Sequence, residues 1–504
     1  MASRVTGLRR LARLACAAFG IAASISAGAA RAEQAEGDLG LRGELTADFS
    51  GEAGPEPPGG GSPPEPEVKP AKNALPALKP YEGAQRLDQR GGPKGLSRGV
   101  SPPPTVAALP TPPRPPRRKP DDRPFAPVGV EVGDLKLTPF VEEDFGWSSN
   151  PSLLPGRQRG SAFTTTEAGV SLDSDWPTSA VHGDLTGGYT DYFADHSADS
   201  PFANGLMDGR YDLSRDSALD AEVRLGLTTM TAGSLGLGPN VAFGPSGAPL
   251  TATYGETIGP DQKLGRLDLS LHGSLDRTVY ENATFSDGVT DDLSSDDFND
   301  WGLRARAAYA VSPEFKPLLD VKVDARRYDL GEDQYGYQHN SDGAEARVGA
   351  DIEFTHLLTG SLDVGFGERN YQDPRLPNLA SPLIDASLIW TATALTTVTL
   401  KSVSSLSETT IPGASGAAQH ATTLAIDHAL RRYLTLTGTI GYLTDDYAGA
   451  PLRDVTTSFG LAANYNLNRA VVLKASASRQ FYSSTQPGTN YTATVLMLGL
   501  RLQR

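Results

Sequence analysis

The chain has 504 residues, a formal net charge of −15 and a single cysteine. One cysteine excludes a disulfide within the chain, and the acidic balance leads us to expect no nucleic-acid partner. No stretch after residue 32 approaches the ~20 consecutive apolar residues of a spanning helix, which excludes a conventional helical membrane protein.

The first segment, 1–32, has the composition of a signal peptide. A basic start precedes a run of apolar and small residues at 14–30, and Ala30-Arg31-Ala32 forms an A-x-A cleavage site. We therefore expect export and a mature chain that begins near Glu33. Cys16 lies in the removed segment, so the mature protein has no disulfide or thiolate chemistry. The basic residues are Arg4, Arg9, Arg10 and Arg13.

Residues 33–127 have a different composition from the rest of the chain. Proline-rich runs occupy 55–67 and 112–120, while aromatic and β-branched residues are scarce. Such a segment buries too little apolar surface to offset its ordering entropy, so we predict a disordered periplasmic linker. A spacer is the favoured role. The alternative is that its basic cluster touches an acidic surface, through Arg114, Arg117, Arg118 and Lys119.

The stretch 264–276 shows the pattern that organises the remainder of the chain. Its leucines share one parity and its charged and polar residues share the other. Successive side chains of a strand point to opposite faces, so this pattern predicts a strand with an apolar face and an ionic face. A soluble sandwich would turn the charges outward, whereas a transmembrane barrel turns leucines to lipid and charges to an aqueous lumen.

Further strands repeat this alternation with charges on the polar side, which favours the transmembrane barrel. A charged residue on the lipid face costs ~2–4 kcal/mol at mid-depth, so regular sorting of this kind is significant. Facing charges on neighbouring strands can line a wet channel and set its ion selectivity. The predicted lumen-lining residues are Asp220, Glu222, Arg224, Arg266, Asp268, His272, Arg304, Arg306, Asp320, Lys322, Asp324, Arg326, Glu345, Arg347, Asp351 and Glu353.

Two classes of connection alternate from residue 135 onward. They predict an all-β, antiparallel up-and-down barrel of about eighteen strands, with both barrel ends on the periplasmic side. Residues 128–132 alternate weakly, but Gly129 and Gly133 weaken a strand, so we favour no strand there. The tight turns are predicted at 175–178, 214–217, 259–262, 312–314, 358–360, 394–396, 431–432 and 467–469. The longer, external loops are predicted at 148–160, 194–202, 232–249, 286–297, 331–339, 372–380, 410–418, 448–452 and 484–489.

Aromatic residues gather at the predicted strand ends, as in the two interfacial girdles of outer-membrane barrels. Near the long loops lie Trp147, Tyr189, Phe193, Tyr280, Tyr328, Tyr371 and Phe481. Near the short turns lie Trp176, Tyr211, Tyr309, Trp390, Tyr433 and Tyr465.

The opening strand at 137–147 reads LTPFVEEDFGW and is followed by Ser149-Asn150-Pro151, while the chain closes with LGLRL at 498–502. On these residues the segment 128–504 resembles the putative β-barrel porin type 2 family of Gram-negative bacteria. The resemblance implies an outer-membrane barrel and leaves its cargo undefined. One departure is the end, Leu502-Gln503-Arg504, where such barrels usually carry an aromatic residue that the assembly machinery reads.

The sequence predicts no enzyme, cofactor or metal site. Its seven histidines form no H-E-x-x-H pair. Asp195-His196 together with Asp291-Asp292 or Asp296-Asp297 could activate water, but acidic loops are far more often simply solvated. The acidic loop 287–300 lacks the spacing of an EF-hand and is at most a loose cation bridge to lipopolysaccharide.

Two functional hypotheses follow for the barrel. The first is a porin-like passive channel for small polar solutes, with loop 232–249 as its expected constriction. The second is a structural barrel that anchors outer loops and a periplasmic linker without open transport. The expected partners are outer-membrane lipid, lipopolysaccharide and the outer-membrane assembly machinery.

Overall fold

The structure is a computed structural model that describes residues 125–504, apart from 157–158, 175, 177, 231–242, 244–246, 334, 408, 410 and 412. The predicted signal peptide 1–32 and nearly all of the predicted linker 33–127 lie outside the described residues. Most of the loop 232–249, the predicted constriction, also lies outside them.

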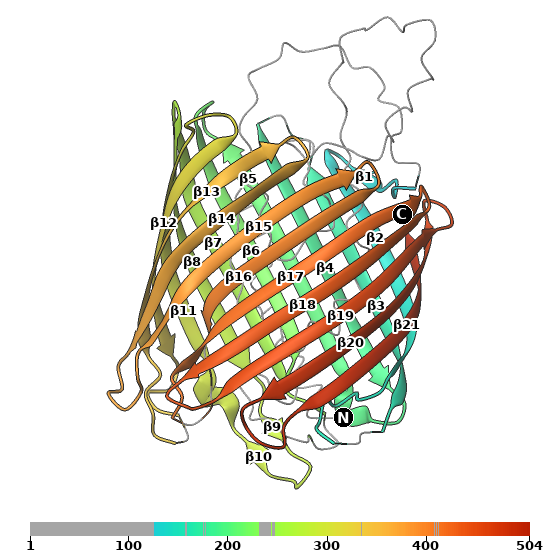
Figure 1. The fold of residues 1–504 in the computed structure, drawn as a ribbon, viewed down its shortest axis with the longest axis vertical. Helices are drawn as coiled ribbons and strands as arrows, with labels where there is room; N and C mark the ends of the chain where they lie inside the picture. The colour runs from blue at the N-terminus through green and yellow to red at the C-terminus, as the bar shows by residue number, and fades with distance from the viewer. Residues whose placement is uncertain are drawn as a thin grey trace, which may run out of the picture.

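The described chain forms one antiparallel nineteen-stranded sheet, of which β1 is an added edge strand and the other eighteen close into a barrel (Figure 1). The predicted fold class and strand number are therefore confirmed. The eighteen strands are β2 (Leu135–Ser148), β3 (Ser161–Ser174), β4 (Ser179–Tyr192), β5 (Ser200–Asp212), β6 (Ser217–Thr229), β7 (Leu250–Leu264), β8 (Leu267–Tyr280), β11 (Phe298–Tyr309), β12 (Phe315–Tyr328), β13 (Ser341–Thr355), β14 (Leu358–Tyr371), β15 (Leu379–Thr393), β16 (Thr396–Ser407), β17 (Gly416–Arg431), β18 (Leu434–Ala448), β19 (Arg453–Asn466), β20 (Val471–Ser484) and β21 (Tyr491–Gln503).

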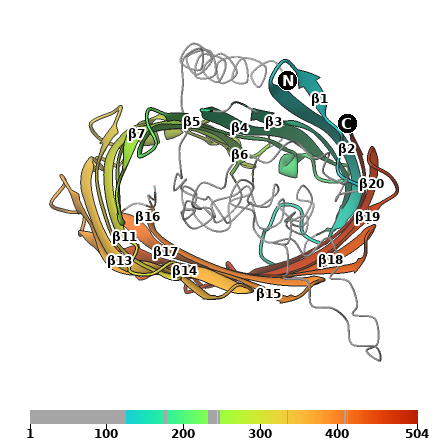
Figure 2. The ribbon, with the colours of Figure 1, turned by 90° about the horizontal axis from the view of Figure 1, so that it is seen from above.

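The barrel closes where its first strand meets its last. β2 pairs with β3 on one side and with β21 on the other, in register from Phe140 opposite Gln503 to Ser148 opposite Val495. The view along the barrel shows the resulting ring of strands (Figure 2). Closure leaves no unpaired edge among these strands, which is the condition for a sheet to lie in lipid.

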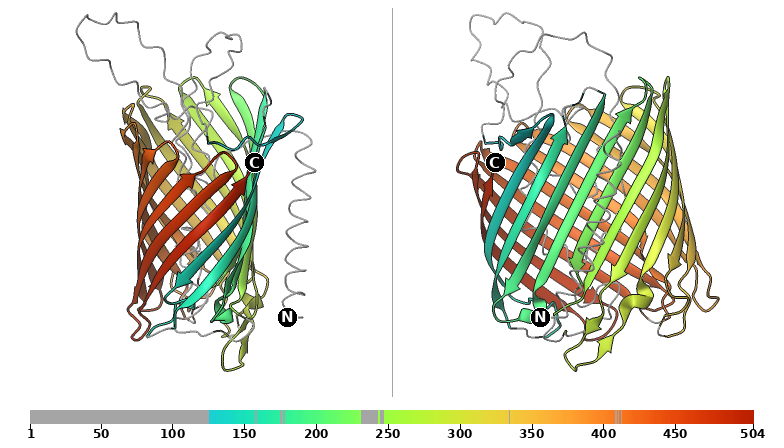
Figure 3. Two further views of the ribbon diagram at one scale, coloured as in Figure 1. Left: turned by 90° about the vertical axis from the view of Figure 1, so that its right-hand side faces the viewer. Right: turned by 180° about the vertical axis from the view of Figure 1, so that it is seen from behind.

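Short turns and longer loops alternate at opposite ends of the barrel, as predicted (Figure 3). Both ends of the barrel chain lie at the short-turn end, because β2 starts there and β21 finishes there. The longer loops carry the hairpin β9 (Ala283–Thr284) and β10 (Thr290–Asp291) and the 3₁₀ turns η2 (His196–Ala198) and η3 (Leu293–Asp296). No helix within the described ranges has the length and apolar character to cross a membrane.

Two predicted turns and one predicted strand start are misplaced. The segment 259–262 is not a turn, because β7 continues through it to Leu264. The chain reverses instead at Gly265-Arg266, with Leu264 opposite Leu267 and Gly265 at φ 65°. A two-residue hairpin favours glycine with positive φ, so the turn takes the glycine that the sequence analysis placed in a strand. A smaller error is the turn at 358–360, which lies at His356-Leu357.

The segment 128–132 contains a strand, contrary to the prediction. β1 (Val130–Val132) pairs with the start of β2, Val132 lying opposite Leu135. Gly133 has φ 64° and begins the two-residue turn between them. The glycine that was expected to weaken a strand therefore forms the hairpin turn that creates one.

The aromatic girdles are present, with three corrections. Side chains exposed near the short turns include Tyr211, Tyr309, Trp390, Tyr433 and Tyr465, and near the long loops Trp147, Tyr189, Phe193 and Phe481. Tyr280, Tyr328 and Tyr371 instead lie on the enclosed face. Tyr280 packs on Met230 and Leu293, Tyr328 on the Phe298 ring, and Tyr371 on Leu379. Position near a strand end does not decide the face, since only parity does.

Candidate functional site: the inner wall of the barrel

The two faces of the barrel wall differ sharply in chemistry. On β12, Leu319 and Val323 are 48% and 47% exposed, whereas Asp320 and Asp324 between and beside them are 2% and 6% exposed. The same alternation runs through β13, where Glu345 and Arg347 are buried and Val348 is exposed. Exposed apolar residues thus form the outer face of the wall, and charged residues are enclosed by it.

The strand register brings many of the predicted residues into cross-strand rows. Arg304 lies opposite His272 on β8 and Lys322 on β12, and Lys322 lies opposite Glu345 on β13. In the next row, Arg306 lies opposite Asp320, which lies opposite Arg347. Ion pairs run between neighbouring positions of these rows.

Some of the ion pairs connect adjacent strands. Arg304 Nε donates to Asp320 Oδ2 at 2.8 Å, and Arg326 Nη2 donates to Asp300 Oδ2 at 2.9 Å. Arg306 on β11 is held less closely and reaches past β12, with Nη2 3.9 Å from Asp351 Oδ1 on β13. Removing one partner of a buried pair leaves an uncompensated charge, so these pairs couple the stability of neighbouring strands.

Other arginines also connect strands that are not adjacent. Arg224 on β6 donates to Glu222 at 2.7 Å and reaches past β7 to Asp276 on β8 at 2.6 Å. Arg347 on β13 lies 2.9 Å from Glu345 and 3.3 Å from Asp385 on β15. Such arginines bridge strands that do not hydrogen-bond to each other.

Three predicted lumen residues lie near the short-turn end. Arg266 is exposed in the turn before β8 and is not on a strand, which corrects its assignment to the lumen. Asp268 forms an ion pair with Lys316, whose Nζ lies 2.6 Å from Asp268 Oδ2. Glu353 lies at the rim of β13, where the register shifts, and pairs with the exposed His356.

A cluster that was not predicted from the sequence spans the closure of the barrel. Glu142 on β2 is fully buried and pairs with Lys474 on β20, at 2.8 Å, and with Arg501 on β21. Arg501 also lies 3.8 Å from Glu167 and 4.0 Å from the centre of the Phe140 ring. The sequence alternation could have identified this cluster. Glu142 and Arg501 alternate with the outward-facing Val141 and Leu502, so they belong to the enclosed face. Other missed partners are Asp276, Asp300, Lys316, Arg369 and Asp385.

Near the long-loop end, the inner wall becomes partly apolar. Leu153, in the loop between β2 and β3, is buried against Tyr482, Tyr491 and Ala493. Phe243, a described residue of the loop between β6 and β7, pairs with Phe285 and stacks on its ring. The first contact holds a loop against the barrel strands, and the second joins two loops to each other.

The loop between β8 and β11 contains a buried carboxyl group outside the spanning strands. Burial and the negative charges of Asp333 and Asp291 raise the pKa of Asp296 from 3.8 to about 7. The docked loop therefore holds a proton that the opened loop would release. Its docked form is most stable below pH 3.8 and loses stability as the pH rises to about 7.

We accordingly expect the backbone amides of 281–297 to exchange hydrogen faster at pH 8 than at pH 5, after correction for intrinsic exchange rates. Asp296→Asn should reduce this difference, because that side chain no longer titrates. A smaller pH dependence should remain, because burial also raises the pKa of the neighbouring Asp297. Asp287→Asn, at an exposed position of the same loop, is the matched control and should retain it. Equal protection at both pH values in the unmodified protein would contradict the prediction.

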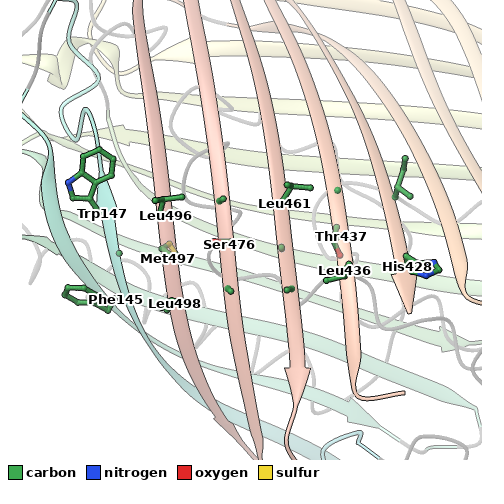
Figure 4. A pocket seen from close by; sticks show the side chains of 17 residues that line it. Phe145, Trp147, His428, Leu436, Thr437, Leu461, Ser476, Leu496, Met497 and Leu498 are labelled. Carbon is green, nitrogen blue, oxygen red and sulfur yellow. The ribbon is translucent and has the colours of Figure 1, made fainter. Parts of the chain in front are cut away.

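An apolar hollow opens on the outer face of the wall (Figure 4). Small residues of β19 and β20, Ala463, Ala475 and Ala477, form its floor, and Leu461 and Leu498 flank it. Leu461 and Leu498 are 68% and 66% exposed, so this groove belongs to the lipid side of the wall. A polar solute gains nothing from such a lining.

The fold and the wall together define a closed transmembrane β-barrel of eighteen strands with an apolar exterior and an ionic interior. In sequence, residues 123–504 match the family model described as "Putative beta-barrel porin 2". The match covers most of the chain, and the protein belongs to this family. No curated protein matches the chain by sequence.

Several solved structures resemble the chain at low identity. The BenF-like porin from Pseudomonas fluorescens Pf-5 is 12% identical with a TM-score of 0.39, covering 74% of this chain and 100% of that one. The outer membrane protein opdK from Pseudomonas aeruginosa is 12% identical with a TM-score of 0.37, covering 73% and 99%. The FrpB iron transporter (F5-1 variant) from Neisseria meningitidis is 10% identical with a TM-score of 0.40, covering 72% of this chain and 65% of its own, less than two thirds. These values describe a distant likeness, and the family assignment rests on the sequence match.

Proposed function

We propose that the protein is a passive outer-membrane channel for small polar solutes, which cross through a charged aqueous lumen. The observation that carries this proposal is the ionic inner wall of an eighteen-stranded barrel. A ring of this size encloses a space too wide for side chains alone to fill. Charges on the inner face are favourable only where water or another charge accompanies them.

The arrangement of the charges supports weak rather than strong ion selectivity. Basic and acidic residues are mixed along the rows of β11 to β13, and most basic residues there have an acidic partner within ion-pair distance. Paired charges largely cancel each other's field at the centre of the lumen. No catalytic role is proposed for any residue.

Single-channel recording in planar bilayers tests the proposal directly. We expect discrete conductance steps from the purified, folded barrel. A barrel that is heat-modifiable but electrically silent would favour the alternative function, in which the barrel anchors loops and linker without transport.

A substitution sharpens the test of the inner wall. Arg306→Ala removes a cation that is only loosely held, at 3.9 Å from Asp351. We expect the reversal potential in a salt gradient to shift towards cation preference. Leu303→Ala, on the exposed face of the same strand, is the control and should leave the reversal potential unchanged. A shift of equal size in both variants would contradict the lumen assignment of Arg306.

We further propose that 1–32 is a cleaved signal peptide and that 33–127 is a disordered periplasmic spacer. The basis is composition alone, since neither segment lies within the described residues. Deleting 33–127 behind the intact signal should leave a protease-resistant, heat-modifiable barrel, because every barrel strand lies after it. Loss of the folded barrel on this deletion would contradict the spacer proposal.

The family and the barrel support a location in the outer membrane of a Gram-negative bacterium. Contacts with lipopolysaccharide and with the assembly machinery are part of the proposal, because such barrels require insertion and face that lipid.

A further inference from the structure

Three metal-ligating side chains converge on the inner wall of β6, β7 and β8. Asp220, Asp261 and His272 each place a ligand atom within 4.8 Å of the other two. His272 Nε2 lies 3.3 Å from Asp261 Oδ1. Asp220 is 1% exposed, and the other two side chains are also largely enclosed, at 22% for Asp261 and 12% for His272.

A glycine in β7 makes this convergence possible. Gly259 pairs with Asp220 on β6. A Cβ at Gly259 would lie 2.3 Å from His272 Cδ2 and 2.1 Å from the carbonyl oxygen of Leu271. Because position 259 has no side chain, the imidazole can lean across β7 towards Asp220, and Asp261 borders the same space from the next inward position. The Gly-Pro-Asp sequence that resembles a turn thus forms a cradle inside a strand.

The donor set suits a first-row divalent transition metal. The two carboxylates supply negative charge. The imidazole supplies a nitrogen donor, which suits Zn²⁺ and other first-row transition metals, whereas Mg²⁺ and Ca²⁺ prefer oxygen donors. In a tetrahedral site, two donors bound at about 2.1 Å lie about 3.4 Å apart, close to the separation of His272 and Asp261. The neighbouring Arg210 donates to Asp212 at 2.8 Å and stays 4.0 Å from the other oxygen of Asp261.

We propose that Asp220, Asp261 and His272 bind a divalent first-row transition-metal ion on the inner wall near the short-turn end. Three protein ligands leave open coordination positions towards the lumen, where water or a polar solute can bind. The site goes beyond the proposed channel function, because metal binding can be measured on the folded barrel whether or not it conducts.

The chain provides a matched control of the same composition. His182 also contacts two aspartates, but through different ring nitrogens: Nδ1 lies 3.1 Å from Asp173 and Nε2 2.8 Å from Asp184. Two carboxylates on opposite sides of a ring cannot share one metal with it. A second group consists of Asp191, near the end of β4, and His196 and Asp199 in the loop that follows it. Its His196 is 68% exposed, so His196→Ala serves as the background for the experiment.

The experiment measures Zn²⁺ affinity by competition with a chromogenic chelator, and Co²⁺ coordination by visible absorption, on the full-length protein in detergent. In the His196→Ala background we expect one site per chain. His272→Ala and the milder Asp261→Asn should each lower the affinity at least about tenfold, the lower limit found even for second-shell changes. His182→Ala should leave both the affinity and the Co²⁺ spectrum unchanged. Heat-modifiability verifies that each variant is folded.

Three results would overturn the proposal. These are no Zn²⁺ binding in the His196→Ala background, binding that persists in folded His272→Ala and Asp261→Asn, or an equal loss in His182→Ala. Asp261→Asn keeps the shape of the side chain, so it decides the matter if His272→Ala does not fold.

Discussion

Glu142→Ala is expected to destabilise the barrel by about 3–5 kcal/mol, the range for breaking a buried ion pair by removing one partner. Glu142 is fully buried and holds Lys474 and Arg501 across the junction of β2 with β20 and β21. Its loss leaves two cations close together in the seam where the ring closes. The measurement is the urea midpoint of the heat-modifiable form, followed by gel mobility.

The neighbouring residue supplies the control for this prediction. Glu143 lies on the outer face and is exposed, with a hydrogen bond from Thr166 at 2.7 Å. Glu143→Ala removes the same group from the same strand but leaves the seam intact, and we expect no loss of stability. If the two variants unfold at the same urea concentration, the seam does not contribute to closure.

Leu271→Arg is expected to destabilise the barrel by about 2–4 kcal/mol, since it places a charge on the lipid face near mid-depth. Leu271 is 46% exposed and lies well inside β8. Leu269→Arg should cost less, about 0–1 kcal/mol, because β8 starts at Leu267 and Leu269 lies near the interface. Unfolding in lipid vesicles as a function of urea measures both values.

Ser270→Arg completes this series on the opposite face. Ser270 lies opposite Arg306 on β11 and Asp261 on β7, and its side chain is on the ionic side of the wall. We expect little loss of stability, because the new guanidinium enters a polar region that holds acidic groups. An equal cost for Leu271→Arg and Ser270→Arg would refute the assignment of the two faces.

The sequence pattern predicted the strands of the barrel wall more reliably than the positions of its turns. Alternation with a period of two identified the strands, and the contrast between short turns and long loops gave their number and direction. Turn chemistry was less reliable. Gly259-Pro260 has the composition of a turn but lies inside β7, since β6 and β8 pair on both sides of it and Gly259 admits the His272 ring.

The sequence by itself determined which residues face lipid and which face the interior, because side-chain direction on a strand is a local property of the backbone. Arg266 was misassigned only because the strand start was placed too early. Tyr280, Tyr328 and Tyr371 were misassigned because their position near a strand end was used in place of their parity on the strand. The tertiary structure alone decided which charges meet. Glu142 and Lys474 are 332 positions apart, and pairing across the closure of the ring brings them together. The register between strands and the closure of the sheet depend on residues far apart in the sequence. No local pattern therefore predicts the ion pairs of Glu142 or the convergence of Asp220, Asp261 and His272.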